Sequence, residues 1–188
     1  SKMKKIGWLK GSKTLDEVTV VAIHRAMVTE LEAYFPGEKV QIIRMDSFSS
    51  NKGKAMMSWF LEAMIHAQFT PPGQHAYLGD LERWWYPLLV RSLIALRQGG
   101  APLAQWFNAM RDALDKECAL ANSLDQVDPT CAYERALGSK HVVSDLACFY
   151  SPARFVLDKG GLPNKFAERA RAGFWVGRDI SFVMNGTV

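Results

Sequence analysis

The chain has 188 residues, of which 48% are hydrophobic, 22% charged and 11% aromatic. This composition is typical of one compact domain and excludes disordered, collagen-like and low-complexity chains. No run approaches the roughly 18 consecutive apolar residues of a membrane span, and the basic start is not followed by an apolar signal core. We therefore expect a cytoplasmic protein of one domain, without an integral membrane segment.

The formal net charge of +4 is unevenly distributed along the chain. Residues 1–13 hold five lysines and no acid, residues 101–135 are net negative, and the balance turns positive again after residue 151. Basic segments near both ends of the chain could attract a phosphate backbone, since neutralised phosphates release their condensed counterions. An ordinary solvated surface would explain the same distribution.

The three cysteines, Cys118, Cys131 and Cys148, form no Cys-x-x-Cys pair. Their long, unequal spacing argues against a zinc ribbon or a thioredoxin-like motif, and their odd number argues against a secreted disulfide framework. We interpret each of them as a small buried hydrophobic residue in preference to a catalytic thiol. Five tryptophans fall at core-facing spacings, and for them we favour packing over base stacking: Trp59, Trp84, Trp85, Trp106 and Trp175.

The first 45 residues indicate a helix followed by a strand. Thr14 and Glu17 have the spacing of a capping box, and apolar side chains then recur at helical intervals, which predicts a helix over about 14–35. Pro36-Gly37 ends that helix. The β-branched segment 39–45 predicts a strand.

A second helix and a second strand are expected next. A loop rich in serine, asparagine and glycine over 47–53 leads to a helical pattern over 55–67. The run of threonine, two prolines and glycine at 70–73 ends this unit. The short segment 74–78 is then expected to form a strand that delivers Gly79 at its end.

Two further helices follow in the pattern. One is expected to begin near Trp85, or to be kinked at Pro87, and to stop at Gly99-Gly100. Pro102 opens a long amphipathic helix to about residue 124 whose second face is acidic. Beyond it, the segment 141–150 fits a strand or a helix equally well, and 174–184 predicts a closing strand.

The loop between the first strand and the second helix is one candidate site. It contains Lys52, Gly53 and Lys54 just before a helix, where unpaired amides and the helix dipole favour a phosphate. The glycine upstream and the hydroxyl residue downstream that a Walker A loop requires are absent. A flexible basic turn remains the alternative interpretation.

The turn from His75 to Trp85 is a second candidate site. Carboxylate oxygens of Asp80 and Glu82 are the ligands that Mg²⁺ prefers, and the Arg83 guanidinium can clamp a phosphate. His75 has a near-neutral pKa in its ordinary state, which suits a general base. Ion pairs on an exposed first helical turn would produce the same pattern.

The order of these elements resembles the ParB/sulfiredoxin superfamily. It comprises the strand 40–46, the helix 55–67, the strand 74–78 and the turn that starts at Gly79, with Arg83 four positions later, before a further helix. In that superfamily a Gly-x-x-Arg turn opens a helix and binds nucleotide phosphates. The resemblance therefore implies phosphate binding by Gly79 and Arg83.

Within the superfamily, the size, basic character and single-domain layout are similar to the plasmid-encoded fertility inhibition proteins, also called oncogenic suppression activity proteins. Those proteins block conjugative or T-DNA transfer, and the family is associated with ATP hydrolysis and DNA cleavage. The resemblance implies DNA and a nucleotide as partners, together with the relaxosome or the coupling ATPase of a type IV secretion apparatus. It also implies a peripheral position at the inner membrane as an alternative to a free cytoplasmic one.

We therefore expect an α/β (α+β) fold with a small mixed sheet. A strand-helix-strand-helix core over about 39–98 and a helical extension over about 101–173 would share one domain, 1–188. The leading hypothesis is a metal-dependent phosphohydrolase that uses Mg²⁺ or another divalent cation and acts on DNA, with ATP as a candidate substrate. Its predicted roles are catalytic for His75, Asp80 and Glu82, phosphate binding for Lys52, Lys54, Gly79 and Arg83, and metal binding for Asp46, Asp80 and Glu82.

A second hypothesis remains open, because the residues do not establish that the protein is an enzyme. A non-enzymatic inhibitor or adaptor would need only an amphipathic surface that docks on a protein partner. The acidic helix over 102–124, with Asp112 and Asp115, or an exposed aromatic patch would supply that surface.

Overall fold

The computed structural model describes residues 9–12, 14, 16–71, 79–120, 130–138, 146–156 and 170–177. Over these residues the chain is a small α+β protein, which confirms the expected fold class. Instead of one mixed sheet, the described residues form two separate sheets of two strands each. The elements are α1 (Glu17–Tyr34), β1 (Ile42–Met45), α2 (Lys54–Glu62), β2 (His66–Phe69), α3 (Gly79–Gly99), α4 (Trp106–Ala119), α5 (Ala132–Leu137), β3 (Pro152–Val156) and β4 (Ala170–Phe174).

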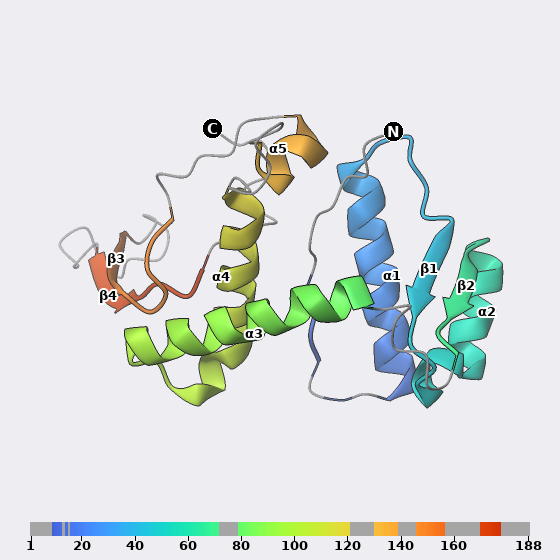
Figure 1. Cartoon of the computed structure of the whole chain (residues 1–188), viewed down its shortest axis with the longest axis horizontal. Coiled ribbons are helices and arrows are strands. Elements are labelled where there is room, and N and C mark those ends of the chain that lie inside the picture. The colour runs from blue at the N-terminus through green and yellow to red at the C-terminus, as the bar shows by residue number, and fades with distance from the viewer. Residues whose placement is uncertain are drawn as a thin grey trace, which may run out of the picture.

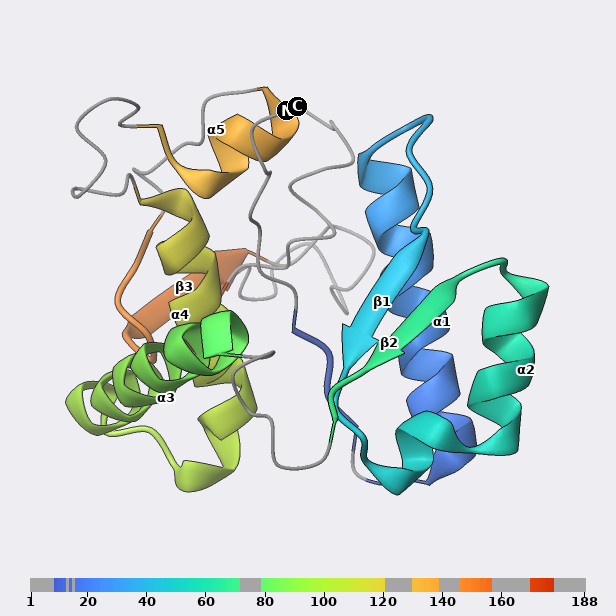
Figure 2. The ribbon, with the colours of Figure 1, turned by 45° about the vertical axis from the view of Figure 1, so that its right-hand side comes forward.

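The first group of elements is a β-α-β unit packed on α1. Strands β1 and β2 are parallel, with Ile42 opposite His66 and Met45 opposite Phe69, and α2 makes the crossover between them. In Figure 2, α1 runs behind the two strands and α2 lies beside them. The shared core consists of Val20, Val21, Met45, Met56, Trp59, Phe60 and Ile65, all of them buried.

Strand β2 begins within the segment that the sequence pattern assigned to a helix. The helix predicted over 55–67 ends at Glu62 in the structure, and Met64 turns the chain with a φ of 54°. Residues 66–69 then pair with β1, so their backbone groups are satisfied by a neighbouring strand. The prediction of helix for residues 63–67 is therefore wrong, and the strand expected over 74–78 lies outside the described residues.

The start of α1 is capped by Asp16 and not by the predicted Thr14. The Asp16 carboxylate accepts a hydrogen bond from the Thr19 amide at 2.9 Å, as an N-cap residue does. The hydroxyl of Thr14 donates to the same carboxylate at 2.6 Å. The helix predicted over 14–35 is otherwise confirmed, and the strand predicted over 39–45 is confirmed in its second half.

The second group of elements is built on the crossing of α3 and α4, which Figure 1 shows in front view. Helix α3 starts at Gly79, six residues before the predicted start, and continues through Pro87. Proline removes one helical hydrogen bond, but Pro87 is exposed, so water can reach the carbonyl that loses its donor. The core here consists of Leu88, Met110, Ala113, Leu114, Cys118, Ala119, Cys131 and Tyr133, and a smaller cluster of Leu96, Ala109 and Phe149 adjoins α3 and α4.

Helix α4 differs from its prediction in its charges. It begins at Trp106 after a short 3₁₀ turn, and the two acids that were expected on a solvent face, Asp112 and Asp115, are buried. The Tyr133 hydroxyl of α5 donates to Asp115 at 3.0 Å, and the Lys116 ammonium donates to Asp112 at 2.6 Å. The predicted acidic surface of this helix is therefore wrong. Buried carboxylates are tolerated where hydrogen-bond donors satisfy them.

The last described elements are the antiparallel strands β3 and β4, paired from Pro152 opposite Phe174 to Val156 opposite Ala170. The closing strand predicted over 174–184 overlaps β4 only at Phe174, and residues 175–177 are irregular. Of the segment 141–150, the described residues 146–150 form neither strand nor helix. Residues 178–184 lie outside the described part.

The expected burial of cysteine and tryptophan is confirmed only in part. Cys118 and Cys131 are buried, and Cys131 also caps α5, whereas Cys148 is exposed. Trp59 is a core residue, but 53% of Trp106 is exposed, so its core assignment is wrong. A helical spacing shows only which residues share a face, and the neighbouring elements decide whether that face is covered.

The segment 9–12 touches both groups of elements. Leu9 packs against the core of the second group, and Gly11 lies so close to Phe107 of α4 that a Cβ there would be 2.5 Å from its ring. Lys10 forms an ion pair with Glu30 of α1. The single-domain organisation, with a core over 39–98 and a helical extension over 101–173, stays a prediction. In the structure, α3 packs on α4, and β1 and β2 share their core with α1.

None of the helices in the described part of the chain combines the length and the apolar character needed to cross a bilayer.

Candidate functional site

The carboxyl edge of the β1–β2 pair carries several of the predicted site residues. Because the strands are parallel, both end at this edge, with Asp46 and Ser47 following β1 and Thr70 following β2. The Thr70 amide and hydroxyl donate to the Met45 carbonyl at 3.0 and 3.2 Å, and the Ser47 hydroxyl donates back to the Thr70 carbonyl. Ligands of open parallel sheets bind at such an edge.

Asp46 is exposed at this edge and organises the loop that follows it. Its Oδ1 accepts hydrogen bonds from Asn51 Nδ2 at 2.5 Å and from the Phe48 amide at 3.4 Å. Both of these bonds go to Oδ1, and a carboxylate has acceptor sites on both of its oxygens. Asp46 therefore holds the loop in place and keeps acceptor capacity toward solvent.

The two lysines of the predicted phosphate loop are both exposed, and the structure places them at the same edge. Lys52 ends the 3₁₀ turn Ser49–Lys52, and its Nζ lies 5.2 Å from the ring centre of Phe69, the last residue of β2. This cation–π contact holds the ammonium above the end of the sheet. Lys54 is the first residue of α2.

The N-terminus of α2 is not open to a phosphate in the way that the sequence suggested. The Glu17 carboxylate of α1 accepts a hydrogen bond from the Ala55 amide at 2.6 Å. A Cβ at Gly53 would collide with the same carboxylate, so glycine is what allows Glu17 to approach. The Glu17 carboxylate is therefore already the anion at this helix N-terminus. This disfavours phosphate binding by the helix amides and leaves the side chains of Lys52 and Lys54 as the candidate phosphate ligands.

Of the predicted turn at 75–85, the described residues 79–85 form the first part of α3. Gly79 begins the helix with open space where a Cβ would stand, and the Arg83 guanidinium donates through Nε to the Gly79 carbonyl at 3.1 Å. Glu82 and Arg83 are exposed on this helix. His75 lies outside the described residues, and so does the side chain of Asp80.

The predicted metal site is not tested as a whole, because the side chain of Asp80 lies outside the described residues. Within the described residues, no group of three or more His, Cys, Asp or Glu side chains is arranged to hold a metal ion. Asp46 follows a strand of the first group, whereas Glu82 belongs to a helix that packs in the second group. We therefore derive no chemical step through a divalent cation.

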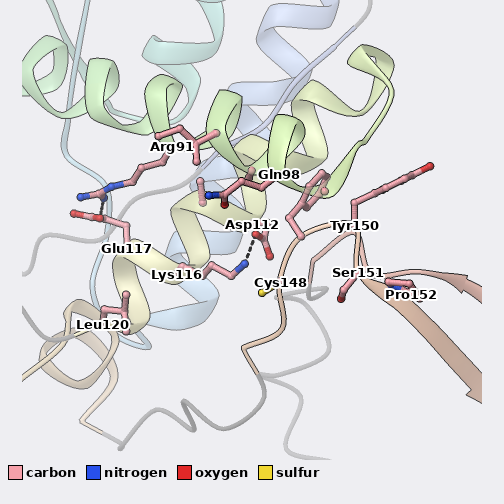
Figure 3. Close-up of a pocket in the computed structure, with 15 residues that line it drawn as sticks. Arg91, Gln98, Asp112, Lys116, Glu117, Leu120, Cys148, Tyr150, Ser151 and Pro152 are labelled. Atoms are coloured by element: carbon pink, nitrogen blue, oxygen red, sulfur yellow. Dashed lines mark hydrogen bonds and ion pairs between the residues drawn. The ribbon is translucent and has the colours of Figure 1, made fainter.

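A cavity that the sequence did not predict lies in the second group. Its volume is about 660 Å³, and its lining comes from α3, α4 and residues 148–152 (Figure 3). Two ion pairs, Asp112 with Lys116 and Arg91 with Glu117, border it. Only the first pair has a sequence signal, the spacing of four residues within one helix.

Burial governs the electrostatics of that cavity. Removal from water raises the pKa of the Asp112 carboxyl, and the hydrogen bond and charge of Lys116 oppose the rise. The indole of Trp175 also lowers this pKa, although its buried Nε1 has no hydrogen-bond geometry to a partner among the described residues.

No protein-family model and no curated protein matches this chain.

Proposed function

We propose that the protein binds the phosphate groups of DNA or of a nucleotide at the carboxyl edge of the β1–β2 pair. The observation that carries the proposal is the placement of two exposed ammonium groups, Lys52 and Lys54, where two parallel strands end. The cation–π contact of Lys52 with Phe69 supports it, because a positioned ammonium loses less side-chain freedom on binding than a mobile one.

The wider proposal is hydrolysis of the bound phosphodiester or of ATP. Its supports are the resemblance to the fertility inhibition proteins and the set His75, Asp80, Glu82 and Asp46. A divalent cation such as Mg²⁺ would supply Lewis-acid activation of water when bound. In a cell, the protein would then restrain transfer of plasmid DNA in the cytoplasm or at the inner membrane face, beside the relaxosome or the coupling ATPase.

Binding is tested by fluorescence anisotropy with labelled single- and double-stranded oligonucleotides over a salt series. We expect the Lys52→Gln/Lys54→Gln double variant to bind more weakly and to lower the slope of log affinity against log salt by up to about 2. Lys39→Gln is the control, because Lys39 is an exposed lysine, ion-paired with Glu32, that precedes β1 and so stands at the opposite end of the strand. Equal losses in the double variant and the control would remove the assignment to this edge.

Hydrolysis is tested on the same protein with DNA and with ATP, in the presence of Mg²⁺ and in the presence of a chelator. Asp46→Asn keeps an oxygen that can accept from Asn51, and Glu82→Gln keeps the side-chain shape, so both variants are expected to fold and to lose turnover. Turnover that survives in both variants would contradict the predicted roles. Binding without any turnover would leave a phosphate-binding protein without phosphohydrolase activity.

A second candidate function, docking on a protein partner, is favoured by one face of α3. Tyr86, Val90, Leu93 and Ile94 recur at helical spacing and are all exposed, with 71% of Tyr86 accessible. The burial of Asp112 and Asp115 excludes the acidic face of α4 as the docking surface. Under this candidate, Tyr86→Ser/Leu93→Ser abolishes inhibition of plasmid transfer between cells while DNA binding is unchanged.

A further inference from the structure

The cavity between α3, α4 and residues 148–152 has the size and the lining of a small-molecule site. Its volume of about 660 Å³ falls within the range of ligand pockets. In Figure 3 the side chains of Gln98, Asp112, Lys116 and Cys148 gather around the space between α3 and α4. The apolar part of the wall consists of Ile94, Ala95, Ala113, Leu120 and Phe149.

The wall on the side of β3 is held in one position. Gly99 of α3 packs so closely on it that a Cβ there would lie 2.7 Å from the Phe149 carbonyl oxygen. Tyr150 has a φ of 59°, a conformation that costs energy for a residue with a side chain. Its amide donates to the Trp175 carbonyl at 2.6 Å, and the Trp175 amide donates to the Ser151 carbonyl at 2.9 Å. The cavity is therefore formed before any ligand enters.

The charged groups favour an anion over a cation. In both ion pairs the cation is the more accessible partner, because the exposed fractions are 28% for Lys116 against 4% for Asp112, and 52% for Arg91 against 37% for Glu117. Among the described residues the Lys116 ammonium donates one hydrogen bond, to Asp112, whereas an ammonium has three donors. The Lys116 ammonium is therefore more accessible to an entering ligand than the Asp112 carboxylate.

We propose that this cavity binds a small organic carboxylate with an apolar body. The carboxylate accepts a hydrogen bond from Lys116, and the positive charge of Arg91 at the border of the cavity adds to the attraction. The apolar body lies against Ile94, Ala113 and Phe149. This site is separate from the carboxyl edge of β1 and β2, and the inference does not depend on phosphate binding there.

The test uses decanoate as the probe, with decanol and decylamine as matched neutral and cationic probes, all below their aggregation concentrations. Isothermal titration calorimetry on the full chain should give one site for decanoate and about tenfold weaker binding of the other two, since one charge-assisted hydrogen bond is lost. Equal binding of the three probes would overturn the assignment of an anion site.

Variants locate the site. Arg91→Gln should weaken decanoate binding about twofold to fivefold through the lost positive charge at the border of the cavity. Ala95→Met fills the apolar wall and should abolish binding. The matched control is Arg97→Gln, an exposed arginine of the same helix that does not line the cavity. Affinity unchanged in both Arg91→Gln and Ala95→Met, with folding verified by circular dichroism, would refute the proposal.

Cys148 gives an independent readout, because it lines the cavity and is exposed while Cys118 and Cys131 are buried. Saturating decanoate should slow the reaction of this thiol with an aromatic disulfide reagent several-fold, and Cys148→Ser should remove the fast phase. A fast phase that decanoate leaves unchanged would show that the probe binds elsewhere and would contradict the proposed site.

Discussion

The hydrogen bond between Tyr133 and Asp115 provides the sharpest test of the buried acids in α4. Both residues are 4% exposed, and the Tyr133 hydroxyl donates to Asp115 Oδ1 at 3.0 Å. Tyr133→Phe removes this donor and leaves the ring packing intact. A hydrogen bond to a charged group is worth about 1.5–3 kcal/mol, and the variant removes one donor from a buried carboxylate. We therefore expect a loss of this size in the free energy of unfolding.

The assay is urea denaturation followed by circular dichroism, with the slope of the transition compared between variants. The midpoint should fall while the slope stays unchanged, since the surface exposed on unfolding is the same. The corresponding drop in Tm is about 3–12 °C for a domain of this size. Asp115→Asn combined with Tyr133→Phe completes a double-mutant cycle that isolates the energy of the pair.

Tyr86→Phe is the matched control, because it deletes the same hydroxyl from a tyrosine that is exposed on α3. Its effect should stay within about 0.5 kcal/mol. If Tyr133→Phe lost no more stability than this control, the buried pair would not stabilise the contact between α4 and α5, and the reasoning would be refuted.

Three further predictions concern packing and pH. Met56 is completely buried and Met57 is 39% exposed, so Met56→Ala should cost about 2–5 kcal/mol in urea denaturation and Met57→Ala much less; equal losses would contradict the assigned core. Hydrogen bonds from Thr14 and Thr19 lower the pKa of Asp16 from 3.8 to about 2, so its carboxylate stabilises the fold at pH values above the pKa of the unfolded chain. This contribution is lost as the pH falls toward the pKa of the folded protein. The stability difference between the wild type and Asp16→Ala should accordingly narrow in acid, and a constant difference would count against the N-cap. Burial raises the pKa of Asp112 above 3.8, so the native state takes up a proton more readily than the unfolded chain and loses stability as the pH rises through the raised pKa. Asp112→Asn should remove that loss, which urea midpoints between about pH 4 and 7 would reveal, and parallel curves would disprove it.

Local sequence patterns correctly predicted the elements whose conformation depends little on contacts with distant residues. The helix over 14–35 and the strand over 39–45 were recognisable because the apolar residues of α1 and the β-branched residues of β1 repeat at intervals that match their own geometry. Even there the cap was misassigned, because Thr14 and Asp16 are both good caps and only the backbone geometry distinguishes them.

The second strand was missed for a reason that lies outside the local pattern. Residues 63–67 continue the apolar spacing of α2, but Met64 adopts a positive φ and the next residues hydrogen-bond to β1, which is more than twenty positions earlier. The energy that decides between helix and strand here comes from that long-range pairing, which a window of neighbouring residues does not contain.

The candidate site shows the same division. The sequence supplied Asp46, Lys52 and Lys54 with a strand before them and a helix after them, and the parallel pairing then placed them at one edge. It did not reveal that Glu17, nearly forty positions earlier, occupies the N-terminus of α2. An amide donor and its acceptor need only be close in space, so their pairing leaves no regular spacing.

By itself, the sequence determined the α+β class, the positions of α1 and β1, and the clustering of charged residues after β1, because these depend on composition and on contacts within a few residues. Only the tertiary structure decided that Asp112 and Asp115 face inward, that the face of α3 with Tyr86 stays uncovered, and that a cavity opens beside Lys116. Burial is a property of packed neighbours. A carboxylate with a donor from another helix is stable inside, and an apolar side chain without a covering element stays outside.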